Sequence, residues 1–314
     1  MGFSVFAHAD MEGMVDAMTL QDTQAIFQKH HLPFKTIEKS SIGFRNDVFL
    51  TEQFVLKCYP DHNTTGFQKE LWFYQTVKPD FAPRLIAYGK NYIILERIWG
   101  TVLFRLWRSM TDSQREDTVA KIAGMIQKIN QVDYRSGAPY LHIPSSWKKH
   151  LLSRIEESVS MLRNSKGISE QLAVQVLEYA KKYGHCLDES SLFLVYADLH
   201  FDNLLVAYNG AHYLLDFEML EIAPLDFVLD VWQRMQIHPF IYANEDDHEL
   251  TKAKDYASIM LWLKKYAPEL FLSPNVRERV DLYGFAYELD MLQRYPMADG
   301  PLHRIQSYLN GVAW

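Results

Sequence analysis

The sequence contains 314 residues, of which 48% are hydrophobic and 23% are charged, as in an ordinary globular protein. Its formal charge is −7, so it lacks the basic surface that a nucleic-acid partner requires. No apolar stretch reaches the ~18 residues of a membrane span, no signal-peptide pattern is present, and Cys58 and Cys186 have no metal-type spacing. We therefore expect a cytoplasmic protein with reduced thiols.

The first third of the chain predicts a small β-rich lobe with one helix, preceded by a short helix. A short helix is expected over 21–31. Phe67, Leu71 and Tyr74 recur at helical spacing and predict a second helix over 65–77. Four β-rich segments predict strands over 46–51, 53–59, 84–89 and 92–97.

After residue 100 the pattern is mainly helical. Thr111 and Gln114 form a capping box, and Ser169 is a second expected helix cap. The expected helices run from 111 to about 130, over 147–162, over 169–180, and from about 224 onward; the expected strands are 192–196, 203–208 and 211–217. This order predicts an α+β fold with two lobes, a smaller one over 1–97 and a larger one over 98–314, joined by a hinge at 97–101.

Polar residues cluster around the later strands. Asp198 and Asn203 bracket a loop between two apolar strands, and Asp216 ends the next strand, 18 residues after Asp198. A tight antiparallel hairpin would bring Asn203 and Asp216 together. Phosphoryl transfer requires such a set, because one Asp accepts or orients the attacking hydroxyl while an Asn and an Asp hold Mg²⁺ on the nucleotide phosphates.

These motifs resemble the aminoglycoside phosphotransferase and choline kinase family, which has a protein-kinase-like fold. The D-x-x-x-x-N element matches at Asp198 and Asn203, and the D-F-E element matches at 216–218. The resemblance covers roughly residues 36–235. It implies that Asp198 is the catalytic residue, that Asn203 and Asp216 bind Mg²⁺, and that ATP or GTP is the cofactor. The family's His before the catalytic Asp is Tyr196 here, at a scaffold position.

The small lobe contains a candidate phosphate-binding group. Gly43 permits a turn whose backbone N–H groups approach phosphates. Lys57 lies in an apolar strand, where an unpaired ammonium is costly, so it needs a partner, and Glu70 on the next helix is the natural one. We expect Lys57 to contact the α- and β-phosphates while Glu70 orients it.

The resemblance adds two further nucleotide contacts. It implies that the segment 42–49, which includes Gly43 and Asn46, is the nucleotide loop. It also implies that backbone groups of Glu96 to Ile98 meet the adenine edge.

Each candidate also has an ordinary structural interpretation. Asp198, Asn203 and Asp216 suit turns and helix caps, Lys57 suits an exposed edge strand, and Glu70 suits a solvated helix face. His200 is expected to orient its loop rather than to react. The acidic run 243–249 is either a solvated segment or a wall that binds a cation.

The sequence predicts a Mg²⁺-dependent kinase that moves the γ-phosphate of ATP or GTP to a hydroxyl of a small acceptor. The acidic charge favours a cationic acceptor such as an aminoglycoside. Choline, ethanolamine, homoserine or sugar kinases of the same family are the alternatives, together with a nucleotide-binding pseudokinase. A protein kinase is disfavoured because no activation segment and no Ala-Pro-Glu element follow Asp216.

Overall fold

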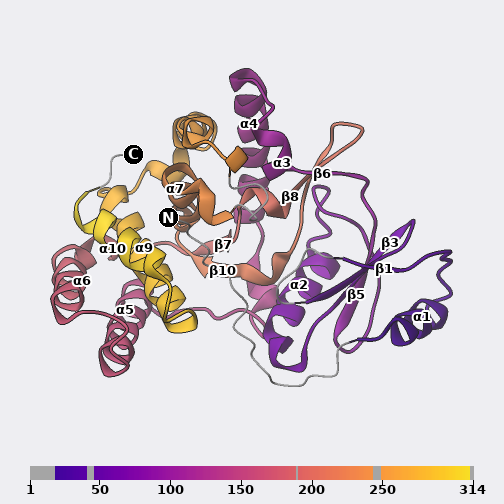
Figure 1. Ribbon diagram of the computed structural model, residues 1–314, viewed down its shortest axis with the longest axis horizontal. Helices are drawn as coiled ribbons and strands as arrows, with labels where there is room; N and C mark the ends of the chain where they lie inside the picture. Colours follow the sequence, from indigo (N-terminus) through magenta and orange to yellow (C-terminus); the bar gives the residue numbers. More distant parts are fainter. Residues whose placement is uncertain (1–17, 41–45, 189, 243–248, 312–314) are drawn as a thin grey trace.

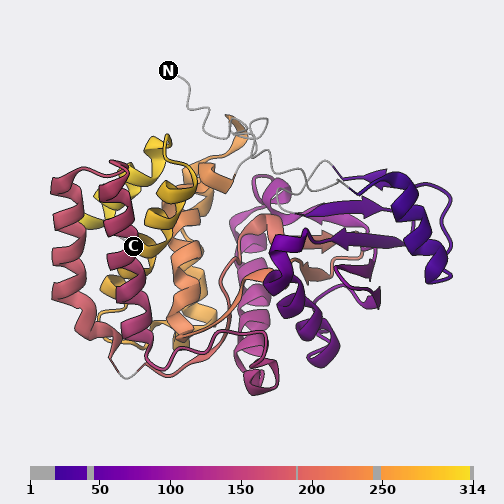
Figure 2. The same cartoon turned by 90° about the horizontal axis from the view of Figure 1, so that it is seen from below.

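The computed structural model describes residues 18–40, 46–188, 190–242 and 249–311. The chain forms two lobes, a sheet lobe built from its first third and a larger, mainly helical lobe (Figure 1, Figure 2). This confirms the predicted α+β, protein-kinase-like arrangement. Within the described ranges, no helix is both long and apolar enough to cross a bilayer.

The first lobe is an antiparallel five-stranded sheet with a helix on each face. Its strands lie in the order β1-β2-β3-β5-β4. Side chains on one face pack with Phe27 of helix α1, and those on the other pack with helix α2. The elements are α1 (Leu20–Lys29), β1 (Glu38–Lys39), β2 (Asp47–Leu50), β3 (Phe54–Cys58), α2 (Thr64–Thr76), β4 (Leu85–Tyr88) and β5 (Tyr92–Glu96).

Alternation along β3 decides which side chains reach α2. Successive residues of a strand point to opposite faces of the sheet. Leu56 packs in the cluster that contains Phe27 of α1, whereas Val55 and Tyr59 pack in the cluster that contains α2. Lys57 has the same parity as Val55 and Tyr59, so its ammonium points toward α2.

The second lobe contains two short sheets and most of the helices. One sheet has the order β6-β8-β9, and the other pairs β10 with β7. Helix α9 contacts both α5 and α10 at the end far from the first lobe (Figure 2). The elements are β6 (Gly100–Val102), α3 (Leu103–Trp107), α4 (Asp112–Asn130), α5 (Trp147–Asn164), α6 (Glu170–Tyr183), β7 (Phe193–Tyr196), β8 (Leu204–Ala207), β9 (His212–Leu214), β10 (Leu220–Ala223), α7 (Leu229–Ile237), α8 (Ile259–Tyr266), α9 (Val276–Arg294) and α10 (Asp299–Leu309).

The predicted helix starts are confirmed by their hydrogen bonds. The Thr111 side chain accepts from the N–H of Gln114, and the Gln114 side chain accepts in return from the N–H of Thr111, so the capping box at α4 is complete. Ser169 caps α6 by accepting from the N–H of Leu172. The region after residue 224 departs from the prediction, because short 3₁₀ turns separate its α-helices.

Candidate active site

The hairpin of β8 and β9 brings the predicted polar residues together. Leu204 pairs with Leu214 in the antiparallel register, and the N–H of Leu215 donates to the carbonyl of Asn203 at 2.9 Å. Asp216, the next residue, therefore lies beside Asn203, as the hairpin prediction required. The Asn203 amide Nδ2 donates to the Asp198 carbonyl at 2.9 Å and lies 3.3 Å from the Asp198 carboxylate.

Two neighbouring residues hold this loop in shape. The hydroxyl of Tyr196, which is buried, donates to the Leu215 carbonyl at 2.7 Å, which agrees with a scaffold position. The Nδ1 atom of His200 accepts from the N–H of Asp202, and its Nε2 lies 3.6 Å from the Asp198 carboxylate. Burial lowers the pKa of His200, but the hydrogen bond and charge of Asp198 outweigh it, so the pKa lies above its ordinary value.

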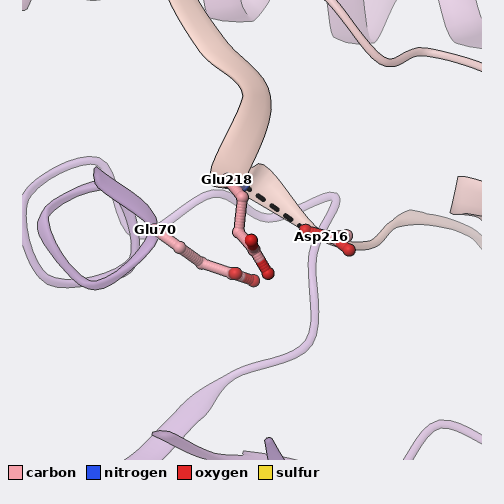
Figure 3. A group of neighbouring side chains, drawn as sticks. All are labelled: Glu70, Asp216 and Glu218. Atoms are coloured by element: carbon pink, nitrogen blue, oxygen red, sulfur yellow. Dashed lines mark hydrogen bonds between the residues drawn. The ribbon is translucent and has the colours of Figure 1, made fainter. Parts of the chain in front are cut away.

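Asp216 adopts a backbone conformation that few residues accept. Its φ of 61° lies in the left-handed region, which Asp tolerates better than most side chains. Its Oδ1 accepts from the N–H of Glu218 and so caps the short 3₁₀ helix that follows (Figure 3). The backbone thus turns sharply here, and the Asp216 side chain stays 41% exposed.

Three carboxylates surround the ammonium of Lys57. Its Nζ lies 2.7 Å from Glu70 Oε2, 2.9 Å from Asp216 Oδ1 and 2.6 Å from Glu218 Oε1. Figure 3 shows these carboxylates converging, one from helix α2 and two from the turn after β9. The predicted Lys57–Glu70 pair is confirmed. Neither the contact with Glu218 nor that with Asp216 was predicted.

Burial and charge shift the ionisation of this group. Burial alone lowers the pKa of Lys57, but the carboxylates of Glu70, Asp216 and Glu218 raise it above its ordinary value. Burial raises the pKa of Glu70 to about 7, against the opposing effect of Lys57. Among the described residues, Glu70 Oε1 has no hydrogen-bond partner, so no hydrogen bond at that oxygen favours the ionised form.

Glu218 has the opposite balance. Burial raises the pKa of Glu218. Lys57 and the side chains of Asn63 and Asn46 lower it by more, so the net pKa lies below its ordinary value. Glu218 is therefore an ionised carboxylate beside a lysine ammonium.

The donor set near Asp216 fits Mg²⁺. Asp216 offers a partly exposed carboxylate. Because Asn203 uses its Nδ2 toward Asp198, its Oδ1 faces elsewhere, and no described residue donates to that oxygen. A carboxylate and an amide oxygen are the hard ligands that Mg²⁺ accepts, with the rest supplied by phosphates and water.

The remaining predicted nucleotide residues divide into three cases. Gly43 lies outside the described residues, and so do residues 243–248 of the acidic run, which was expected to be a solvated segment or a cation-binding wall. Asn46 is described, and its amide donates to Glu218. The N–H of Glu96 donates to the Arg84 carbonyl, whereas no described residue accepts from the N–H of Ile98.

Sequence reasoning missed the other half of this cluster. Glu218 belongs to the recognised D-F-E element, but its contact with Lys57 was not predicted. Its hydrogen bonds with Asn46 and Asn63 were not predicted either. The one available signal was Asn63 itself, a polar residue beside the predicted start of a helix.

Two later aspartates are structural. Asp226 is buried and accepts from the guanidinium of Arg279. Asp230 forms a buried ion pair with Arg234 on the same helix. Their charges are thus neutralised within the helical lobe.

Known proteins share this sequence pattern and this fold. The sequence profile of the phosphotransferase enzyme family matches residues 36–232. No curated protein sequence matches the chain. A solved gentamicin complex of APH(2″)-IIa has a TM-score of 0.66 and 13% identity, covering 96% of this chain and 98% of that chain.

Two further solved structures give the same result. A GDP and kanamycin complex of APH(2″)-IIia has a TM-score of 0.67 and 16% identity, covering 94% of this chain and 100% of that chain. The aminoglycoside phosphotransferase APH(4)-Ia has a TM-score of 0.67 and 14% identity, covering 93% of this chain and 98% of that chain. At these identities, the similarity shows a common fold.

Proposed function

The chain belongs to the phosphotransferase enzyme family, and we propose that it is a Mg²⁺-dependent kinase that transfers the γ-phosphate of ATP or GTP to a hydroxyl of a small molecule. One observation carries the proposal. Supporting contacts join the loop after β7, the turn after β9 and β3: Asn203 donates to the Asp198 carbonyl, the N–H of Leu215 donates to the Asn203 carbonyl, and Asp216 contacts Lys57. The side chains of Asp198, Asn203, Asp216 and Lys57 are those that phosphoryl transfer requires.

Each residue then has a distinct part in the reaction. Asp198 accepts the proton of the acceptor hydroxyl as that oxygen attacks phosphorus. Asn203 Oδ1 and Asp216 would hold Mg²⁺, which would neutralise charge on the phosphates. His200, with its raised pKa, lies against Asp198 and orients its carboxylate.

Lys57 must exchange one partner to meet phosphates. An ammonium has three N–H donors, and three carboxylates lie within 3 Å of it. Glu70 and Glu218 are buried, whereas the Asp216 side chain is 41% exposed. Asp216 is therefore the partner that would be available to the metal, and the α- and β-phosphates would take its place on Lys57.

The adenine edge meets the segment after β5. The N–H of Ile98 makes no hydrogen bond with a described residue, so it is available as a donor, and the carbonyl of Glu96 is the companion acceptor. Residues 97–101 are then the hinge between a nucleotide lobe over 1–97 and an acceptor lobe over 98–314. Gly43 and Asn46, in the proposed nucleotide loop, would lie beside the phosphates.

A cationic aminoglycoside is the first acceptor we propose, because solved structures of the same fold contain gentamicin or kanamycin. The acidic balance of the chain favours such an acceptor. Choline, ethanolamine, homoserine and sugars follow. We propose a cytoplasmic location, because both cysteines are free thiols, as is usual in a reducing compartment.

A coupled assay with ATP and with GTP tests the proposal across aminoglycosides, choline, ethanolamine, homoserine and methylthioribose. We expect one acceptor class to be phosphorylated and chelation of Mg²⁺ to stop the transfer. Nucleotide binding without transfer to any of them would instead indicate a pseudokinase.

A further inference from the structure

The carboxylate of Glu218 contacts side chains from three elements of the first lobe. It accepts from Lys57 Nζ of β3 at 2.6 Å and from Asn63 Nδ2, at the start of α2, at 2.7 Å. The Asn46 amide, just before β2, donates to Oε1, the oxygen that also meets Lys57, whereas Asn63 donates to Oε2. Asn63 also donates to Asn46 at 3.3 Å, so the two amides are joined to each other.

Glu218 itself is firmly anchored in the second lobe. It lies in the 3₁₀ turn after Asp216, and the preceding Phe217 is completely buried. The ring of Phe217 lies 5.5 Å from that of Tyr196 in the second lobe and 4.4 Å from that of Phe73 on α2 of the first lobe, measured between ring centroids. A carboxylate held on such a turn can fix the position of the groups that donate to it.

Asn63 departs from the usual behaviour of its position. Asn at a helix N-cap normally accepts from a backbone N–H of the first turn. At α2 no such bond forms, and the amide turns to Glu218 and Asn46 instead. The helix therefore forgoes a cap in favour of a contact with the other lobe.

Gly66 leaves room for this contact. A Cβ at Gly66 would overlap Asn63 Oδ1 and would lie 3.0 Å from Glu218 Oε2. Gly66 is buried in the first turn of α2, where Ala is ordinarily the better helix former. Space at this point, rather than helix propensity, accounts for the glycine.

We propose that Glu218 is a positioning residue, an interlobe latch that fixes Lys57, Asn46 and the start of α2 relative to the turn carrying Asp216. The latch thereby sets the distance between the lysine that meets the phosphates and the aspartate that meets the metal. This inference rests on the nucleotide roles proposed above for Lys57 and Asp216.

The test measures dissociation constants for ATP and for GTP, with Mg²⁺ and in EDTA, on the full chain. Asn63→Asp keeps a good N-cap but places a carboxylate against Glu218, so we expect nucleotide binding to weaken about tenfold or more in both conditions. Thr65→Asp is the matched control, because it adds the same charge to the first turn of α2 at an exposed position. We expect its affinity to stay within about twofold of the wild type.

Two further variants separate the latch from other roles. Combining Asn63→Asp with Glu218→Gln exchanges the carboxylate and the amide across the contact, so the double variant should bind nucleotide more tightly than Asn63→Asp alone. Gly66→Ala should weaken binding although it favours the helix. Circular dichroism and thermal unfolding establish that each variant is folded.

The outcomes discriminate clearly. Nucleotide binding by Asn63→Asp equal to that of Thr65→Asp would overturn the latch and leave the proposed kinase function intact. Weakening confined to the Mg²⁺ condition, with no recovery in the double variant, would also overturn it and would make Glu218 a metal ligand. If the variants change nucleotide affinity as predicted but the wild type phosphorylates no acceptor, the latch is supported and the kinase function is refuted. A wild type that binds neither nucleotide would refute both.

Discussion

The substitution Glu70→Gln should change how stability depends on pH. Glu70 is buried and its pKa is raised to about 7, from an ordinary value of 4.5. A carboxyl whose pKa rises on folding stabilises the folded state while it is protonated. That contribution is lost as the pH rises from about 4.5 to about 7, because the unfolded chain then ionises more readily.

The magnitude follows from the size of the pKa change. Each pKa unit corresponds to about 1.4 kcal/mol, so the raised pKa of Glu70 lowers the free energy of unfolding by about 3 kcal/mol at pH 8 and by under about 1 kcal/mol at pH 5. Gln cannot ionise and lacks this cost. The stability of Glu70→Gln relative to the wild type should therefore increase by roughly 2–3 kcal/mol between pH 5 and pH 8.

Urea unfolding of the two proteins at pH 5, 6, 7 and 8 measures this difference directly. Glu178→Gln provides the control, because it makes the same chemical change at an exposed position of α6 and should reproduce the wild-type pH profile. A difference between Glu70→Gln and the wild type that stays constant, or that shrinks as the pH rises, would refute the reasoning about this buried carboxyl.

Three other predictions follow from single contacts. Lys57→Met removes the cation from two buried carboxylates and should destabilise the protein by about 3–5 kcal/mol at pH 8 and by less at pH 5, as measured by urea unfolding; an equal loss at both values would contradict it. Tyr59→Phe removes a donor 2.6 Å from Glu70 and should cost about 1–2 kcal/mol in the same assay, whereas no loss would show that the contact is not maintained. Thr111→Ala removes the cap of α4 and should cost about 1 kcal/mol by thermal unfolding, with nucleotide binding unchanged.

Local physical rules predicted much of the site. An ammonium in an apolar strand needs an anion, and that requirement was sufficient to pair Lys57 with Glu70, 13 positions away. The apolar segments on either side of a short turn predicted the hairpin that joins Asn203 to Asp216. Capping residues likewise located the start of α4.

The contacts of Glu218 were beyond such rules. Its partners Asn63 and Asn46 lie 155 and 172 positions away, and no periodicity links them. They meet only because the turn after β9 packs against α2, with Phe217 beside Phe73. The same reason applies to Asp226, whose partner Arg279 comes from a helix 53 positions later. Long-range pairing depends on how the elements pack, which one sequence does not encode locally.

The most direct test of the kinase assignment is to compare Asp198→Asn with the wild type, using the acceptor that the panel identifies. Asn keeps the shape of the side chain but cannot accept the hydroxyl proton. We predict that the turnover number falls by about 10²–10⁴ while the nucleotide dissociation constant stays within about twofold. Turnover close to that of the wild type would contradict the central claim that Asp198 is the catalytic base of a small-molecule kinase.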